Sequence, residues 1–567
     1  MDITFFGAAR HVTGSCTLVT CNGISIMIDC GLAQGKDRKD MGDELSFDPA
    51  LVDILLLTHA HIDHSGRIPQ MVKDGFKGQI WSTDATAKLC EIMLEDSAHI
   101  QESEIEWVNR KKKRAGKKLE EPLYTIKDAI KSLEFFHTCD YKEVINLSKG
   151  ISCRFVDAGH LLGSASIELW LLEGDVRRKL VFSGDIGNFD QPIINDPDYL
   201  DDADIVIMES TYGDRIHPKP DGAVGSNVPT IVRAKELAGI IKTTFDRGGN
   251  VIVPSFAVGR TQEILYLCRY IIDNNLLPEY KNLPVYVDSP LSVKATEIFA
   301  SSIQGYYDKE AMEIINRGEN PIIFSSLTTI TDVEQSKELN SILTPKVLIS
   351  SSGMCDAGRI KHHLKHNLWR PECTILFSGY QANGTLGRSI LDGARHVTIF
   401  GEQINVKCEI TNLNGISGHA DQEGLMAWIK SFKKEPKQIF VNHGEAEVAQ
   451  FFASFIVKEL GINAYAPKKF ESFSLIDISV LPKQIGAKIP NTKNRQLTEA
   501  LSALVEGRDG LESVVARLVE SSRNISLDEN STNRLINAIE RLASDLDYLS
   551  DKWGANAPVS TTTVEKK

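Results

Sequence analysis

A strand that ends in a cluster of histidines constrains the fold of this chain more than any other feature. The run Ile54 to Leu57 is apolar and has the length of a buried strand. Directly after it, three histidines and one carboxylate lie within six residues, namely His59, His61, Asp63 and His64. At strand alternation the two histidines that come first point the same way, whereas the last two side chains follow around a turn. Because imidazole and carboxylate suit zinc, and also iron or manganese, we predict a metal centre in which this segment serves two ions.

The same placement of a polar side chain after a strand recurs along the chain. Strand-like runs or Gly-rich turns lead into five more such residues: His160, Asp185, Glu209, His419 and His443. A single histidine or aspartate after a strand is usually a turn residue. The repetition favours a site, because α/β proteins build sites where strand ends meet on one side of a sheet. Asp29 also ends a strand and leaves two interpretations open: it caps a turn, or it orients a metal-bound histidine.

Length and composition limit the class of protein. With 567 residues the chain is too long for one core, and at ~100–200 residues per domain we expect about three units. Apolar residues make up 42% and charged residues 25%, as in ordinary soluble proteins. No apolar run reaches the length of about 18 residues that a membrane span needs, and the N-terminus reads as a strand rather than a signal peptide. The ten cysteines form no C-x-x-C pair, which indicates a reduced, cytoplasmic protein.

The charge distribution has one strong local exception. The net charge of −13 argues against a protein that coats nucleic acid, although bound metal ions would add positive charge in a local groove. Within this acidic chain, Arg110 to Lys118 holds seven basic residues in nine. One interpretation is a solvated loop or helix end. The other is a contact with a polyanion near the metal site.

The expected secondary structure changes along the chain. Short strands are expected at 3–6, 16–21 and 24–28, and residues 83–145 read as helical. Residues 214–395 alternate helices, such as 260–273, with parallel-type strands at 250–254, 284–288, 346–350 and 374–377. Strands return after 395. From about 490 the sequence is polar and helical, with an apolar stripe that fits a helical hairpin first and dimerisation second: Leu535, Ile539, Leu542, Leu546 and Leu549.

These motifs together resemble a known family. The histidine cluster at 59–64, followed by His160 and Asp185, resembles the metal motifs of the metallo-β-lactamase fold, an αβ/βα sandwich with a metal pair at its rim. Glu209, His419 and His443 match motifs A, B and C of its β-CASP branch of nucleic-acid-processing nucleases. The segments 209–213 (ESTYG), 288–292 (DSPLS) and 379–388 (GYQANGTLGR) are similar to bacterial and archaeal relatives of the 73-kDa subunit of the cleavage and polyadenylation specificity factor. The resemblance covers roughly residues 1–475.

The resemblance implies an α/β architecture with an insertion. The expected parts are a first metallo-β-lactamase part (1–210), an inserted β-CASP domain (211–395) and a second metallo-β-lactamase part (396–480). A helical extension (490–557) and a disordered tail (558–567) would complete the chain.

The resemblance also implies a ligand set and residue roles. One ion would take His59, His61 and His160, the other Asp63, His64 and His443, and Asp185 would bridge both. The implied cofactor is two Zn²⁺ ions, with Mn²⁺ or Fe²⁺ as alternatives. His419 would be the general acid, Glu209 would hydrogen-bond it and favour its protonated form, and Asp29 would orient a ligand histidine. Weaker candidates for phosphate contacts come from Gly-rich loops of the insertion: Ser352, Tyr380, Thr385 and Arg388.

The implied function is a metal-dependent ribonuclease that cleaves single-stranded RNA, mainly internally, as a cytoplasmic homodimer. Four alternatives stay open. A 5′ exoribonuclease uses the same chemistry. A DNA nuclease is disfavoured because DNA-acting relatives usually have valine where this chain has His443. A small-molecule metallo-hydrolase would lack the insertion, and a non-catalytic scaffold would lose metal ligands, whereas all seven are present here.

Overall fold

Two β-sheets face each other in the part of the chain that carries the predicted site. The computed structural model describes residues 1–217, 229–301, 304–382, 384–477 and 483–484, all within one unit, Met1–Ile489. The predicted extension 490–557, its apolar stripe from Leu535 to Leu549 and the predicted tail 558–567 lie outside the described residues.

The first sheet has eight strands in the order β23-β22-β1-β2-β3-β4-β5-β6. Their bounds are β1 Asp2–Gly7, β2 Cys16–Cys21, β3 Ile24–Ile28, β4 Ile54–Leu56, β5 Gln79–Thr83, β6 Phe136–Cys139, β22 Glu471–Ser474 and β23 Lys483–Gln484. The three short strands expected near the N-terminus are present. β3 to β6 run parallel to one another, so their carboxyl ends meet at one edge of the sheet.

The second sheet has seven strands in the order β21-β20-β11-β10-β9-β8-β7. Their bounds are β7 Val144–Ser148, β8 Ile151–Asp157, β9 Ala165–Glu173, β10 Val176–Phe182, β11 Ile205–Met208, β20 Gln438–Val441 and β21 Ala464–Tyr465. β10, β11 and β20 are parallel neighbours although β20 lies far away in sequence. A distant segment thus returns to place its strand end beside those of β10 and β11.

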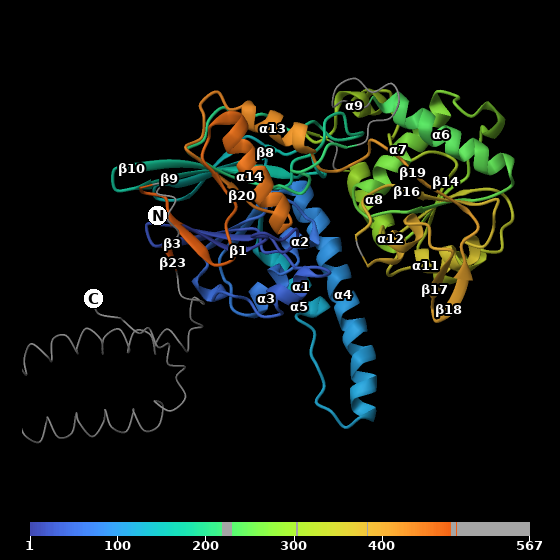
Figure 1. Ribbon diagram of the computed structural model, residues 1–567, viewed down its shortest axis with the longest axis horizontal. Coiled ribbons are helices and arrows are strands. Elements are labelled where there is room, and N and C mark those ends of the chain that lie inside the picture. Colours follow the sequence, from blue (N-terminus) through green and yellow to red (C-terminus); the bar gives the residue numbers. More distant parts are fainter. Residues whose placement is uncertain (218–228, 302–303, 383, 478–482, 485–567) are drawn as a thin grey trace, which may run out of the picture. The chain divides into compact units, whose positions relative to one another are not determined.

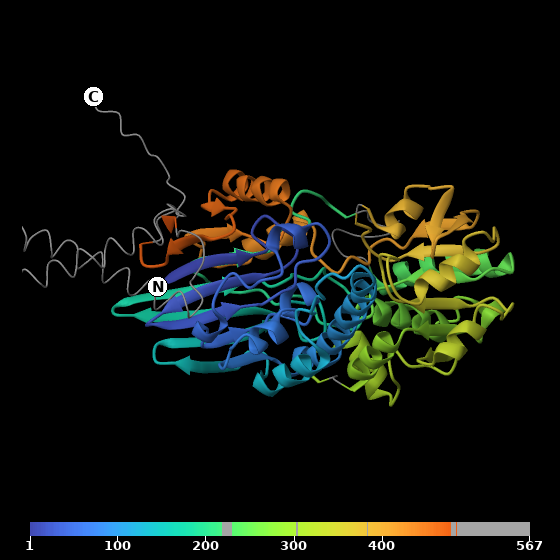
Figure 2. The same ribbon diagram turned by 90° about the horizontal axis from the view of Figure 1, so that it is seen from below.

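Apolar side chains between the two sheets form their shared core. Aliphatic and aromatic residues from both inner faces meet there, among them Ile3, Phe5, Leu56, Phe155, Phe182 and Phe440. Helices cover the outer faces: α2 Ile62–Ser65, α3 Ile68–Lys73, α4 Asp84–Arg114 and α5 Ile126–Ser132 on the first sheet, and α13 Gln422–Lys430 and α14 Ala446–Leu460 on the second. This αβ/βα sandwich confirms the expected fold class (Figures 1 and 2).

A third, parallel sheet is inserted between β11 and β20. Its strand order is β14-β13-β15-β12-β16-β19, with β12 Val251–Pro254, β13 Val285–Asp288, β14 Leu327–Ile330, β15 Val347–Ser350, β16 Thr374–Phe377 and β19 Glu409–Asn412. The helices of this part are α6 Thr230–Asp246, α7 Arg260–Asp273, α8 Pro290–Ser301, α9 Lys309–Asn316, α10 Val333–Glu338, α11 Ile360–Asn367 and α12 Leu386–Leu391. β19 lies beyond the predicted boundary at 395, and so does the whole hairpin of β17 His396–Ile399 and β18 Glu402–Asn405. The sheet of the insertion therefore ends at Asn412 (Figure 1).

Two local predictions are wrong. Residues 83–145 are helical only as far as α5 and a short turn after it, because 136–139 pairs with β5 as a parallel strand and 144–148 pairs with β8. The strand before the histidine cluster ends at Leu56, and residues 57–61 are irregular. Strand alternation is therefore not the reason why His59 and His61 lie together.

Two further observations concern the physical setting of the chain. The ten cysteines are all buried and free. Within the residues that the structure describes, no helix combines the length and apolar character needed to cross a bilayer.

Candidate metal centre

The seven residues predicted as metal ligands lie in connections that follow strands of both sheets. The connection after β4 supplies His59, His61, Asp63 and His64, and the connections after β8, β10 and β20 supply His160, Asp185 and His443. His61 is the residue before the first turn of α2, which then carries the next two ligands. The short helix, rather than an extended strand, turns one segment toward two groups of ligands.

The backbone around these ligands is packed closely. A Cβ atom on Gly31 would lie 1.6 Å from the carbonyl oxygen of Asp63, and one on Gly187 would lie 1.6 Å from that of Gly159. Asp29 and His443 have φ angles of +58° and +49°. This left-handed conformation is uncommon for non-glycine residues, although aspartate and histidine adopt it more readily than most. The surrounding fold therefore fixes the backbone of two predicted site residues in an uncommon conformation.

Four ligand atoms converge in the first group. His61 Nδ1 lies 3.0 Å from His59 Nε2 and 3.2 Å from His160 Nε2. Asp185 Oδ2 lies 3.5 Å from His59 Nε2 and 3.7 Å from His160 Nε2. A tetrahedral ion with bonds of about 2.0–2.1 Å keeps its ligands about 3.3 Å apart. The observed spacings fit such an ion.

The second group takes the other oxygen of the same aspartate. Asp185 Oδ1 lies 3.3 Å from His64 Nε2 and 3.7 Å from His443 Nε2. The two imidazole nitrogens are 3.0 Å apart, and His443 Nε2 is 3.6 Å from Asp63 Oδ2. Asp185 Oδ1 is buried and accepts no hydrogen bond from any described residue. A buried oxygen without a partner is costly, and a cation at the centre of this group would satisfy it.

The ring nitrogens that face away from the two groups have partners of their own. His64 Nδ1 lies 2.7 Å from Asp29 Oδ2, His160 Nδ1 lies 2.8 Å from the carbonyl oxygen of Gly418, and His443 Nδ1 lies 3.2 Å from Thr211 Oγ1. Such outer contacts fix the tautomer and the direction of a ligand imidazole. Of the two interpretations of Asp29, the geometry thus matches the orienting one.

The electrostatics favour metal-binding protonation states at three of the five imidazoles and at Asp63. Burial lowers the pKa values of His59, His61 and His160, with neighbouring imidazoles adding to the effect. At His64 and His443 burial lowers the pKa, but the neighbouring carboxylates raise it more. Burial alone would raise the pKa of Asp63, but the hydrogen bond from His443 and the charge of His64 lower it to about 2. Neutral imidazoles and ionised carboxylates are the forms that bind a divalent cation.

His419 and Glu209 meet beside these ligands. His419 Nδ1 lies 3.1 Å from Glu209 Oε2 and 3.3 Å from Oε1, and the His419 ring is 4.4 Å from that of His160. Glu209 is buried and also accepts a hydrogen bond from the backbone N–H of Ile186. Burial lowers the pKa of His419, but the charge and hydrogen bond of Glu209 raise it more, to about 9. A pKa raised in this way favours the imidazolium form of His419, in which both ring nitrogens carry a proton.

Comparisons with known proteins agree with this geometry. Family models match in order along the chain: the metallo-beta-lactamase superfamily at 9–139, the Beta-Casp domain at 261–390 and the Zn-dependent metallo-hydrolase RNA specificity domain at 403–467. The chain is 36% identical over 447 residues to "Ribonuclease TTHA0252" of Thermus thermophilus, covering 79% of this chain and 94% of that relative. This chain belongs to the β-CASP branch of the metallo-β-lactamase superfamily.

Other β-CASP relatives match over similar lengths. "Transcription termination factor FttA" of Methanosarcina mazei is 30% identical, covering 84% of this chain and 71% of that protein. "RNase J-like protein" of Methanocaldococcus jannaschii is 30% identical, covering 82% of this chain and 97% of that protein. The family expected from the motifs is thus confirmed, and with it the assignment of this chain as a metal-dependent hydrolase.

Two residues next to the β-CASP histidine His419 were missed in the sequence. His217 Nε2 lies 3.1 Å from the carbonyl oxygen of His419, and the Tyr212 ring is 4.7 Å from that of His217 and 5.9 Å from that of His419. His217 does not directly follow a strand or a glycine, so the sequence did not single it out as a site residue. Tyr212 belongs to the segment that resembles motif A, which was the only available hint.

The four predicted phosphate contacts of the β-CASP domain have different surroundings: Ser352, Tyr380 and Thr385 lie in loops after strands, whereas Arg388 lies in the first turn of α12. Thr385 caps α12, since its hydroxyl accepts the Arg388 N–H at 3.1 Å and donates to the Ala382 carbonyl. Arg388 pairs with Asp392 through Nε at 2.9 Å and Nη2 at 2.8 Å. Tyr380 is 48% exposed, and Ser352 is half-buried. The first two side chains have structural partners, and a phosphate role for all four stays a prediction.

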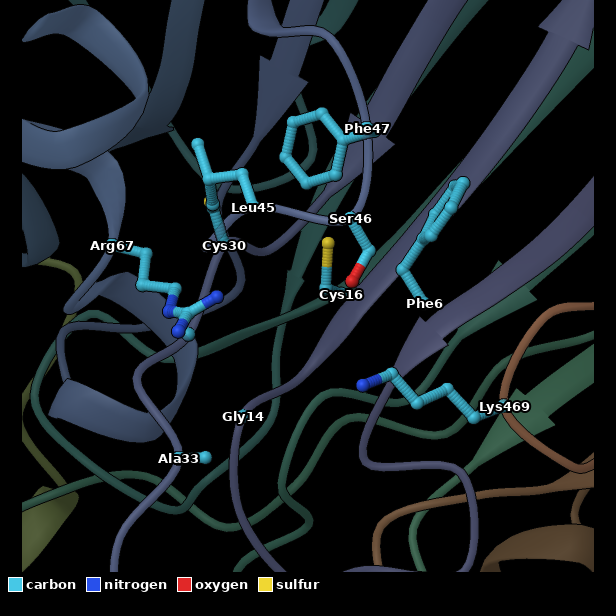
Figure 3. A pocket seen from close by; sticks show the side chains of 11 residues that line it. Phe6, Gly14, Cys16, Cys30, Ala33, Leu45, Ser46, Phe47, Arg67 and Lys469 are labelled. Atoms are coloured by element: carbon cyan, nitrogen blue, oxygen red, sulfur yellow. The ribbon is translucent and has the colours of Figure 1, made fainter. Parts of the chain in front are cut away.

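A separate pocket borders the first sheet of this β-CASP protein (Figure 3). Phe6, Cys16, Cys30, Arg67 and Lys469 are among its lining residues, and none of the seven predicted ligands is. Arg67 is buried and donates to the carbonyl oxygens of Glu44 and Gly42. Water centres can occupy about 30 Å³, roughly the space of two molecules. Its size suits ordered water rather than an organic ligand.

Proposed function

We propose that this β-CASP chain is a zinc-dependent ribonuclease that hydrolyses phosphodiester bonds of single-stranded RNA, mainly at internal positions. The observation that carries the proposal is Asp185, whose two oxygens face two separate groups of imidazole and carboxylate ligands. The relatives that are named as ribonuclease and RNase J-like support RNA as the substrate class. We further expect a homodimer in the cytoplasm, where buried free cysteines stay reduced.

The proposed ligands divide into two sets that share one residue. His59, His61 and His160 would hold one Zn²⁺, Asp63, His64 and His443 would hold the other, and Asp185 would contact both. A pair of ions supplies an acidified water as nucleophile and neutralises charge on the phosphate oxygens. Asp29, Gly418 and Thr211 keep three of the ligand rings in position through their outer nitrogens.

The protonated His419 would complete the reaction as general acid. The leaving ribose oxygen needs a proton, and an imidazolium can donate one from Nε2 while Nδ1 stays bonded to Glu209. Glu209 does not contact the substrate in this scheme. It stabilises the charged imidazole and fixes which nitrogen faces the reacting bond.

Cleavage of an end-labelled RNA tests this function. A single-stranded RNA labelled at either end would be incubated with the zinc-loaded protein, with a chelator, and with matched DNA. His419→Ala is the test variant and His396→Ala, an exposed histidine of β17, is the matched control. We expect internal fragments that vanish with the chelator and with His419→Ala, by roughly 10²–10⁴-fold in rate, but persist with His396→Ala.

Products other than internal RNA fragments would indicate a different activity. Mononucleotides released from the 5′ end indicate a 5′ exoribonuclease, and faster cleavage of DNA indicates a DNA nuclease of the same branch. A folded, zinc-loaded protein that cleaves neither polymer contradicts the proposal and favours a scaffold role.

A further inference from the structure

The end of helix α4 forms a basic projection that the proposed chemistry does not use. α4 runs from Asp84 to Arg114, and its last half stands away from the sandwich in Figure 1. Residues 110–118 hold the seven basic residues noted in the sequence, and all of them except Lys112 are exposed. We define residues 107–120 as the α4 tip.

The tip is a closed structure, not a free loop. The Asn109 side chain donates to the carbonyl oxygen of Glu120 at 2.8 Å and accepts the N–H of the same residue at 2.8 Å. Lys112 pairs with the Glu120 carboxylate. These contacts bring the returning chain back onto the helix and hold the intervening basic residues on a fixed support. Less conformational entropy is then lost when the tip binds a partner.

Most of the positive charge of the tip is unneutralised. Arg110 pairs with Glu106, and the Lys111 amine lies 3.4 Å from the centre of the Trp107 ring. The remaining four side chains make no ion pair with any described residue: Lys113, Arg114, Lys117 and Lys118. The negative end of the helix dipole accounts for some preference for cations near the end of α4. It does not account for four unpaired cations, of which Arg114 is the last helical residue and two lie beyond it.

The base of α4 is hydrogen-bonded to the loop that carries His160. Thr83 caps the helix and donates to the carbonyl oxygen of Gly163 at 2.7 Å, and Thr86 donates to the same oxygen at 2.8 Å. Gly163 belongs to the loop of His160, whose N–H donates to Ser164. One rigid helix therefore joins a proposed ligand loop to the basic tip, and at 1.5 Å per residue its 31 residues span ~45 Å.

We propose that the α4 tip is a second RNA-binding surface, which contacts phosphates of the substrate strand at a distance from the cut. The inference rests on the proposed ribonuclease function. Lysine and arginine neutralise phosphates without reading sequence, and the exposed Trp107 (58%) offers a ring on which a base can stack. On a chain with a net charge of −13, the tip is a local surface of opposite sign that attracts a polyanion.

Salt-dependent binding of RNA tests the proposal without cleavage. The full chain in chelator would bind a labelled single-stranded RNA of about 30 nucleotides, long enough for the ~45 Å helix. The tip variant replaces Lys113, Arg114, Lys117 and Lys118 by alanine. The control variant replaces four exposed lysines elsewhere by alanine: Lys77, Lys149, Lys309 and Lys434. A third variant keeps the tip charge with Lys113→Arg, Lys117→Arg and Lys118→Arg.

Four phosphate contacts predict a clear result. About 0.7 counterion is released per phosphate of a single strand, so the plot of log affinity against log salt becomes shallower by about 3 in the tip variant. Binding at low salt becomes at least tenfold weaker. The control and the charge-preserving variant keep the wild-type slope. Equal slopes for the tip variant and wild type overturn the proposal. So does loss of binding to vesicles containing phosphatidylserine with unchanged RNA affinity, which would assign the tip to a membrane surface.

The assay separates this inference from the proposed function. If the chain binds RNA through the tip but never cleaves it, the ribonuclease proposal fails and the binding surface stands. If it cleaves RNA and the tip variant binds like wild type, the tip inference fails alone.

Discussion

Asp29 Oδ2 lies 2.7 Å from Nδ1 of His64, and the same carboxylate accepts hydrogen bonds from the N–H and hydroxyl of Thr58. This contact turns Nε2 of His64 toward Asp185 and His443. Residue 29 is thus linked to the second ligand group without touching its centre.

Asp29→Asn tests that link. Asparagine tolerates the φ of +58° at this position but lacks the charge that supports the imidazole. We expect the affinity for the zinc of the second group, which contains His64, to fall by about 10–100-fold, measured by competition with a coloured chelator. Asp175→Asn, in an exposed turn, is the control. Equal zinc affinity in both variants would show that Asp29 has only a local structural role.

Glu209→Gln tests the control of the proton donor. The charge of Glu209 raises the pKa of His419, which must be protonated to act as an acid. Activity is therefore present below that pKa and is lost as pH rises through it. Removing the charge lowers the pKa, so the alkaline limb of the pH–rate profile should move to lower pH, by about one unit or more. A profile with an unmoved limb would exclude His419 as the group that titrates there.

Phe440→Ala tests how the distant β20 is held in the sandwich. The Phe440 ring is buried and lies 5.3 Å from that of Phe5 and 4.7 Å from that of Phe473. The loss of this contact should lower the free energy of unfolding by about 3–5 kcal/mol, measured by urea denaturation. Phe451→Ala, 47% exposed on α14, should lower it by less than about 1 kcal/mol. Similar losses in both variants would contradict the assigned core.

The position of several candidate ligands at strand ends was predictable because strand ends have a simple sequence signature. His160, Asp185 and His443 each follow a short apolar run, and the structure places the corresponding strands β8, β10 and β20 in one sheet. The order of those strands was not predictable from spacing, since the whole insertion separates β20 in sequence from its neighbour β11. The resemblance to a family indicated only that the chain returns to the metallo-β-lactamase domain after the insertion, not which strands pair.

Contacts between irregular segments were beyond sequence reasoning. His217 contacts the His419 backbone because two irregular segments that are distant in sequence lie next to each other. Hydrophobic periodicity does not predict a contact of this kind. Residues 136–139 were predicted as helix but form the strand β6. They are held in the sheet by backbone hydrogen bonds to β5, and backbone pairing does not depend on the side chains from which the prediction was made. The basic run at 110–118 was visible, but the Asn109 contacts that close it were not.

The most direct measurement is the zinc content of the purified protein and two single-group variants after equilibrium dialysis. The account predicts about two ions per chain for the wild type, since two groups share Asp185. His61→Ala and His443→Ala each alter one group and should each retain about one ion. Asp185→Asn should weaken both sites. A wild type that binds a single ion, or variants that lose both ions together with their fold intact, would contradict the paired centre on which the proposed function depends.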